Sequence, residues 1–216
     1  MTTTWIDEGF MAFDIETTGL DIEEARIVTA AAVHFRDGEP GDIHTWLIKV
    51  DVPIPSAASD VHGITDEISQ RDGQEQAQAL AEIQDVLESS GLPVVSYNSA
   101  FDIPILNANL ARQGRKPIEV AAVICPWIID KQLNKYVRGK NQRRLKPTAE
   151  RYGIELSEVE WHGAQADAIA AGRILIAEGA SYALVRHTAP EELSALIATW
   201  RVEQEAEFQE WLARQN

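Results

Sequence analysis

The sequence contains almost no cysteine: Cys125 is the only one among 216 residues. A lone cysteine excludes an intrachain disulfide and a zinc site built from several thiolates. The fold must therefore rest on an apolar core, and a hydrophobic content of 45% is sufficient for one. The length fits a single domain with one appended element.

Long apolar runs are also missing. No stretch approaches the roughly 18 apolar residues that a membrane-spanning helix needs. The N-terminal segment MTTTWIDEGF lacks the basic and apolar regions of a signal peptide. We therefore expect a soluble cytoplasmic protein without a membrane partner.

Basic residues are scarce, with 19 lysines and arginines against 34 acidic residues and a net charge of −15. This balance argues against a nucleic-acid partner, because phosphate binding usually requires a basic surface. The basic residues are clustered, however: seven of the 19 lie within residues 131–146, where no acidic residue occurs. We name residues 131–146 the basic segment. It is either a binding surface for phosphates or a solvated surface without a partner.

The alternation of apolar and turn-forming residues predicts an α/β fold with a mixed sheet. Three strands joined by short turns come first, and strands alternating with helices follow. Strands are expected over residues 11–15, 26–35, 43–50, 93–97 and 120–125. Helices are expected over residues 74–89, 100–113, 127–137, 144–152 and 164–178.

Carboxylates stand where apolar residues would be expected. Asp14 and Glu16 interrupt the strand FMAFDIE. Because side chains along a strand alternate between its faces, both carboxylates project to the same side. Two neighbouring carboxylates repel each other and resist removal from water, so they require a cation. Asp102 begins the helix after strand 93–97, at the sheet edge where open α/β folds place their sites.

The segment WHGAQADA adds a histidine and a fourth acid, His162 and Asp167. On one continuous helix, residues five apart would face directions about 140° apart. The two side chains converge only if His162 lies in a loop before the helix and Asp167 lies in its first turns. Gly163 permits that break.

Together the four acids match the charge of two divalent cations. Mg²⁺ and Mn²⁺ prefer oxygen ligands. Two such ions about 3.5–4 Å apart can activate a water and stabilise a leaving oxygen in phosphodiester cleavage. A neutral histidine nearby can accept the proton of that water.

The segments FDIETTGL, YNSAFD and H-x4-D, in this order and spacing, resemble the three motifs of the DEDDh (DnaQ-like) exonucleases, the family of the proofreading subunit of bacterial DNA polymerase III. HGIT at residues 62–65 matches the segment that this family has between its first two motifs. The similarity covers about residues 8–178, and the layout is most similar to small stand-alone bacterial and phage members. It implies a ribonuclease-H-like fold with a five-stranded mixed sheet flanked by helices.

The resemblance also implies roles for individual residues of a 3′→5′ exonuclease that releases nucleoside 5′-monophosphates. The metal ligands would be Asp14, Glu16, Asp102 and Asp167, and His162 would be the general base. The substrate-binding positions would be Thr17, Thr18, Gly19, Leu20, His62, Ile64, Thr65, Asn98 and Phe101, with Arg143, Arg144 and Lys146 of the basic segment. One departure is Cys125-Pro126, where many relatives have an aspartate. It affects local geometry rather than catalysis.

The substrate and the class of protein stay open at this point. We expect single-stranded or frayed 3′ ends, of DNA rather than RNA, as in proofreading or DNA repair. An exoribonuclease acting on short RNA is the alternative, because discrimination depends on tolerance of the 2′-hydroxyl group. A silent module that binds nucleic acid or a polymerase is a third possibility, against which the complete set of acids and His162 argue.

A long amphipathic helix is expected over residues 188–216, after an exonuclease domain of residues 1–180. It begins with the capping pattern Thr188-Ala-Pro-Glu191. Its apolar stripe must be covered by the domain or by a partner, either a second copy or a polymerase. The stripe consists of Leu193, Leu196, Ile197, Trp200, Phe208, Trp211 and Leu212.

Overall fold

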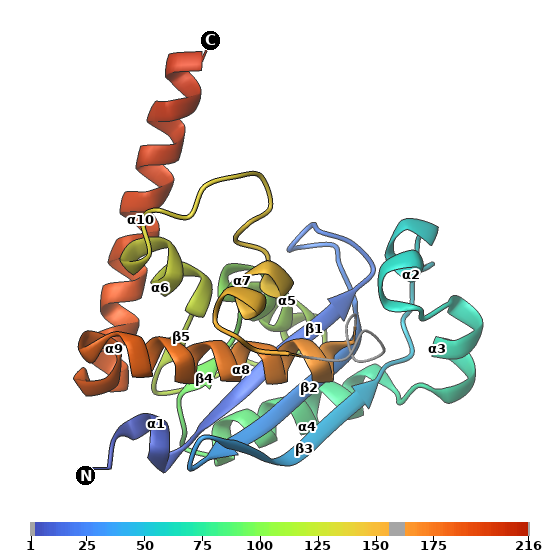
Figure 1. The fold of residues 1–216 in the computed structure, drawn as a ribbon. Helices are drawn as coiled ribbons and strands as arrows, with labels where there is room; N and C mark the ends of the chain where they lie inside the picture. The colour runs from blue at the N-terminus through green and yellow to red at the C-terminus, as the bar shows by residue number, and fades with distance from the viewer. Residues whose placement is uncertain (1–2, 156–162, 216) are drawn as a thin grey trace.

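The computed structural model describes residues 3–155 and 163–215, and its centre is a five-stranded sheet in the order β3-β2-β1-β4-β5 (Figure 1). The strands are β1 (Phe10–Thr17), β2 (Ile27–Arg36), β3 (Glu39–Leu47), β4 (Val94–Val95) and β5 (Val123–Ile124). The helices of the described residues are α1 (Trp5–Glu8), α2 (Ser56–His62), α3 (Asp66–Asp72), α4 (Gln76–Ser89), α5 (Ser99–Arg112), α6 (Pro126–Leu133), α7 (Leu145–Arg151), α8 (Ala164–Ser181), α9 (Ala183–His187) and α10 (Pro190–Gln215).

The sheet is mixed, as predicted. β1, β2 and β3 form an antiparallel meander, whereas β4 pairs parallel with β1, and β5 pairs parallel with β4. Asp37 and Gly38 connect β2 to β3 with positive φ angles of 52° and 80°. Such angles are required in a two-residue hairpin turn whose twist matches that of its strands.

Each face of the sheet is covered by helices, which gives three layers. Met11, Phe13 and Ile15 of β1 pack against α4 and α5 on one face. Phe10 and Ala12 project to the other face, which α8, α6 and the start of α10 cover. The alternation along β1 therefore sends Asp14 and Glu16 to the face covered by α8.

Helix α8 lies unusually close to the sheet. A Cβ atom at Gly172 would lie 2.5 Å from the ring of Phe35 on β2. Ala168 and Ala171, in the same helix, are fully buried. These small residues allow the axis of α8 to approach β1 and β2, and so bring the first turn of the helix close to the end of β1.

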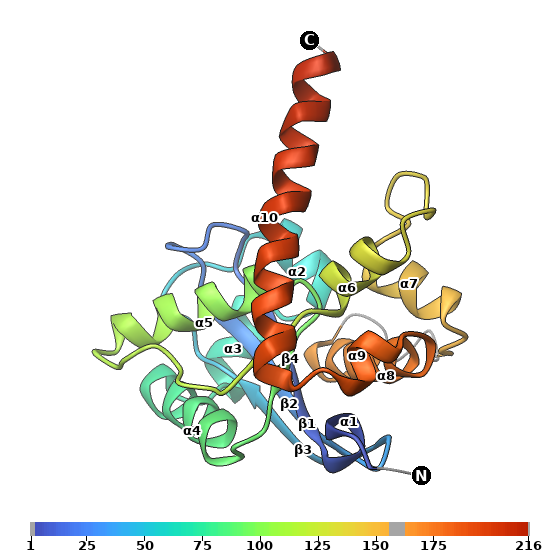
Figure 2. The ribbon, with the colours of Figure 1, turned by 90° about the vertical axis from the view of Figure 1, so that its left-hand side faces the viewer.

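Helix α10 is covered along only its first half. Leu193, Ile197 and Trp200 are buried against the domain. The residues from Glu205 to Arg214 are exposed, and the C-terminal half of the helix projects away from the body (Figures 1 and 2). Phe208 and Trp211 there are 47% and 53% exposed. Within this chain the domain therefore buries only the first half of the stripe, and a cover for the second half stays a prediction.

Several local predictions need correction. The short helices α1, α2, α3 and α9 were not predicted, because each has fewer than two full turns of apolar periodicity. The predicted helix 127–137 ends at Leu133, and strands β4 and β5 are two residues long. In the described part of the chain, no helix has both the length and the apolar content needed to cross a membrane.

Candidate active site

Two of the predicted acids lie on β1, close to its C-terminal end. Asp14 and Glu16 pair with Ala31 and Thr29 of β2, and the register shifts immediately afterwards, between Glu16 and Thr17. Irregularities of this kind often re-aim side chains beside active sites. Both carboxylates remain partly accessible, although their strand is buried.

Asp167 joins these two acids from the first turn of α8. One carboxylate oxygen from each of Asp14, Glu16 and Asp167 lies within 4.8 Å of the other two. The close approach of α8 to the sheet places the third acid in this cluster, which we name the acidic centre. Helix–sheet packing thus brings Glu16 and Asp167 together, although they lie about 150 residues apart in the sequence.

Asp102 lies beside the acidic centre and is 3% exposed. Its Oδ2 atom accepts a hydrogen bond of 2.6 Å from the Ser96 hydroxyl. Asn98, which precedes α5, adopts a left-handed conformation with φ 68° and ψ 46°, a conformation that asparagine tolerates better than most residues. This turn directs α5 away from the strand and sets Asp102 in its first turn.

The electrostatics of the acidic centre are those of a site short of positive charge. Burial, followed by repulsion from Asp102, Asp167 and Glu16, raises the pKa of Asp14 well above its usual range. Burial, followed by Asp167 and Asp102, raises the pKa of Glu16 to about 7. Burial also raises the pKa of Asp102 to about 7, although its hydrogen bond with Ser96 acts in the opposite direction.

The predicted nucleotide-binding turn follows β1 directly. The Thr17 hydroxyl donates a 2.6 Å hydrogen bond to the Gly19 carbonyl, and Thr18 Oγ1 accepts from the Arg26 backbone N–H. Leu20 is 84% exposed. Burial lowers the pKa of His62, while the backbone of Thr17 acts in the opposite direction, so His62 lies against this turn.

The remaining predicted contacts around the turn have structural partners of their own. Ile64 packs on a small apolar cluster formed by Val28, Val50 and Ile54. Thr65 caps α3 by accepting a hydrogen bond from the Ile68 backbone N–H. Phe101 packs partly against the core beneath α5. The structure thus brings the acids together with Thr17–Leu20 and His62, while their contacts with substrate stay predictions.

Within the basic segment, Arg143 differs from its neighbours. Its guanidinium pairs with Asp130, which is fully buried, and donates a 2.8 Å hydrogen bond to the Asn134 carbonyl. Arg144 and Lys146 are exposed. Arg143 therefore supports the loop, which makes it a poorer candidate for a phosphate contact than the other two.

Two further predicted features are His162 and Cys125, and their roles also stay predictions. His162 lies outside the described residues. Cys125, at the position of the aspartate found in many relatives, is buried at the N-cap of α6.

Sequence reasoning missed Ser96 and Asp130, which hold Asp102 and Arg143. A serine that interrupts the apolar run PVVSY was the only available signal for the first of them.

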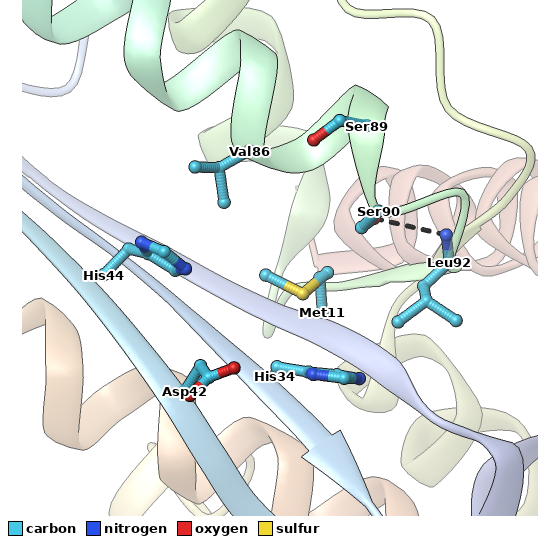
Figure 3. Close-up of a pocket in the computed structure, with 8 residues that line it drawn as sticks. All are labelled: Met11, His34, Asp42, His44, Val86, Ser89, Ser90 and Leu92. Atoms are coloured by element: carbon cyan, nitrogen blue, oxygen red, sulfur yellow. Dashed lines mark hydrogen bonds between the residues drawn. The ribbon is translucent and has the colours of Figure 1, made fainter.

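A second polar cluster lies near the opposite end of β1. His34, His44 and Asp42 surround Met11 in a shallow cavity of about 280 Å³, which Val86, Ser89, Ser90 and Leu92 also line (Figure 3). Among the described residues, the acidic centre is the one group of three whose ligand atoms lie within 4.8 Å of one another. The histidine cluster does not meet this condition, so the candidate metal site is the acidic centre.

Solved structures with this fold include exonuclease I of E. coli. A zinc-bound complex with single-stranded DNA has a TM-score of 0.71 and 19% identity, and covers 82% of this chain and 42% of that chain. A complex with a dA16 oligonucleotide has a TM-score of 0.72 and 18% identity, with the same coverage. The fold therefore belongs to the ribonuclease-H-like exonuclease class, as predicted.

The sequence comparisons identify the family. Residues 11–175 match the exonuclease family RNase_T, so the chain belongs to this family. DNA polymerase III of the PolC type from Streptococcus suis is 32% identical over 169 residues, and that from Mycoplasma genitalium is 26% identical over 165 residues. These matches cover 78% and 74% of this chain, but the chain spans only 11% of each relative. The predicted membership among the DnaQ-like 3′→5′ exonucleases is confirmed.

Proposed function

We propose that this chain removes nucleoside 5′-monophosphates from the 3′ ends of single-stranded or frayed DNA, with two divalent ions, Mg²⁺ or Mn²⁺, as cofactors. The observation that carries the proposal is the convergence of Asp14, Glu16 and Asp167, with carboxylate oxygens within 4.8 Å of one another.

The donor set fits hard divalent cations. All three groups offer carboxylate oxygens, which Mg²⁺ and Mn²⁺ prefer. In the described part of the chain, no lysine or arginine forms an ion pair with Asp14 or Glu16. Burial and mutual repulsion raise the pKa of both acids, and bound cations would relieve that repulsion.

Each residue then has a distinct task. Asp14, Glu16, Asp102 and Asp167 hold the ions, which when bound supply Lewis acidity and neutralise developing charge on the phosphate. The turn Thr17–Gly19 holds the terminal nucleotide, and exposed Leu20 separates the last two bases. His162 accepts the proton of the attacking water.

DNA is favoured by the relatives. The sequence relatives are DNA polymerases, and the E. coli exonuclease I structures hold single-stranded DNA or a dA16 oligonucleotide. Short RNA is the alternative substrate, and the same experiment distinguishes the two.

The test is hydrolysis of matched DNA and RNA oligonucleotides, each labelled at the 3′ or the 5′ end, with Mg²⁺ or Mn²⁺. We expect early release of label from the 3′ end, a ladder from 5′-labelled DNA, and slower cleavage of RNA. Asp14→Asn is the control for a contaminating nuclease. Release of label first from the 5′ end, or equal activity in Asp14→Asn, would contradict the proposal.

The role of His162 has its own test. His162→Ala should lower turnover by roughly 10²–10⁴-fold, the usual effect of losing a general base, and leave the Mn²⁺ affinity unchanged. Turnover above about a third of wild type at saturating metal and DNA would exclude His162 as the base.

A further inference from the structure

The loop between α6 and α7 carries an exposed aromatic side chain. Tyr136 is 89% exposed, more than any other large apolar or aromatic side chain among the described residues. Five basic residues around it are also exposed: Lys135, Arg138, Lys140, Arg144 and Lys146. Both views show this loop standing out on the side from which α10 projects (Figures 1 and 2).

The base of this loop is fixed to the domain by a buried acid. Asp130 is fully buried and forms ion pairs with Arg143 and Arg151, the second at 2.8 Å. Arg151 also donates a hydrogen bond to the Gln142 carbonyl, and Tyr152 donates one of 3.1 Å to Asp130. Arg143 and Arg151 thus hold the loop, whereas Lys135, Arg138 and Lys140 are exposed.

A second contact joins the loop to the segment that precedes Asp102. The Tyr97 hydroxyl donates a 2.7 Å hydrogen bond to the Arg143 carbonyl and lies 2.8 Å from Thr148 Oγ1. Tyr97 directly precedes Asn98, the turn that sets Asp102 in place. The loop is therefore fixed to the same segment that carries Asp102, a proposed metal ligand.

We propose that residues 135–144 form a subsite for the upstream part of a single-stranded nucleic acid, in which Tyr136 stacks on a base and the exposed cations contact phosphates. The proposal rests on the proposed function, since it extends the same strand beyond the acidic centre. An exposed aromatic ring among cations is the arrangement that single-strand binding surfaces use, because every base offers a face for stacking.

The experiment measures binding of labelled oligothymidylates to an Asp14→Asn background by fluorescence anisotropy, which makes it independent of hydrolysis. For an oligonucleotide of roughly 12 residues, Tyr136→Ala should raise Kd by about 5- to 100-fold, the usual effect of losing one stacked base. Tyr136→Phe, which keeps the ring, should restore wild-type binding. Val202→Ala removes another exposed apolar side chain, on α10, and serves as the matched control.

Substrate length provides a readout that a folding defect would not reproduce. The ratio of variant to wild-type Kd should grow at least fivefold between a dinucleotide and the longer strand, because only the longer strand reaches the loop. The ratio should also persist at high salt, since stacking does not depend on counterion release.

Three outcomes would overturn the subsite. The first is an unchanged Kd for the long strand in Tyr136→Ala. The second is an equal loss for the dinucleotide, which would indicate damage to the acidic centre. The third is an equal loss for DNA and for polyglutamate, which would indicate a surface for acidic proteins. Failure of the proposed function looks different: the wild type would then hydrolyse no oligonucleotide, whatever the variants bind.

Discussion

The acidic centre and the basic segment are both dense in charge of one sign, but they are built in opposite ways. Asp14, Glu16 and Asp167 lie on a central strand and a tightly packed helix, and their carboxylates are drawn together with raised pKa values. The cations around Tyr136 lie on an exposed loop. Packing forces like charges together at the acidic centre, whereas water screens them on the loop.

This difference fits the ligand that we propose for each region. Carboxylates held together on rigid elements require counter-charge that fits a small, fixed space, which suits metal ions. Exposed cations on a loop provide attraction at low specificity and allow fast release, which suits a strand that must move after each cleavage. A protein with net charge −15 can therefore act on a polyanion, provided that its few cations are concentrated along the path of the strand.

The largest effect should come from the acidic centre. Asp14→Asn should lower turnover on DNA by on the order of 10³-fold, because fixed charge at a reacting centre contributes several kcal/mol to transition-state stabilisation. Steady-state hydrolysis at saturating Mn²⁺ measures this. The matched control is Asp42→Asn, an exposed acid near the other end of the sheet. A similar loss in both variants would remove the distinction between the acidic centre and ordinary surface acids.

The acidic centre and the neighbouring Asp102 could be predicted in part from the sequence, because these acids lie in three short segments. Alternation along β1 fixes the common face of Asp14 and Glu16, and the strand-to-helix junction fixes Asp102. The approach of Asp167 was not derivable from spacing alone. It depends on small residues in α8, such as Gly172, that let the helix pack against β2.

The second effect concerns the buried acid that holds the basic segment. Asp130→Asn leaves Arg143 and Arg151 without their carboxylate, and breaking a buried ion pair typically costs about 3–5 kcal/mol. We expect about 3 kcal/mol of lost stability, because both guanidinium groups remain partly accessible. Urea unfolding measures the change, and Asp42→Asn again provides the control. A decrease in the free energy of unfolding below about 1 kcal/mol, the range found for surface ion pairs, would mean that Asp130 does not hold the loop in place.

The role of Asp130 could not have been read from the sequence. The sequence alone does not distinguish the seven cations of the basic segment from one another. Only the structure shows that Arg143 pairs with Asp130 of α6, whereas Arg144 is exposed. The exposure of the second half of α10 could not be predicted either. Buried Trp200 and exposed Phe208 and Trp211 are all large aromatic residues, so residue type does not show where the contact with the domain ends.

The third effect is the pH dependence of stability without metal. The pKa of Glu16 rises from 4.5 to about 7 on folding. Its contribution to stability is therefore complete below about pH 4.5 and is lost as the pH rises through about 7. Glu16→Gln should reduce this loss between pH 5 and pH 8 by on the order of 2 kcal/mol, after allowance for solvent screening. Thermal unfolding in a chelator, compared with Glu39→Gln as an exposed control, measures it. Parallel pH profiles for the two variants would mean that the acidic centre carries no excess repulsion.

The smallest effect should come from the exposed cations. Changing Arg144 and Lys146 together to alanine should raise KM for single-stranded DNA by about tenfold at low salt, with turnover at saturation unchanged, since two phosphate contacts are lost while the acidic centre is untouched. Each lost contact should also reduce the slope of log KM against log salt by about 0.7, so the double variant should be less sensitive to salt by roughly 1.4. Arg36 and Lys116, exposed cations elsewhere on the protein, provide the control pair.

Arg143→Ala should behave differently from either pair, with lower stability as its main consequence, because its guanidinium holds the loop through Asp130. If the Arg144 and Lys146 variant gives the same small KM change as the control pair, the basic segment is a solvated surface. The proposed contrast between an acidic centre that binds metal ions and a basic segment that binds a moving strand would then not hold.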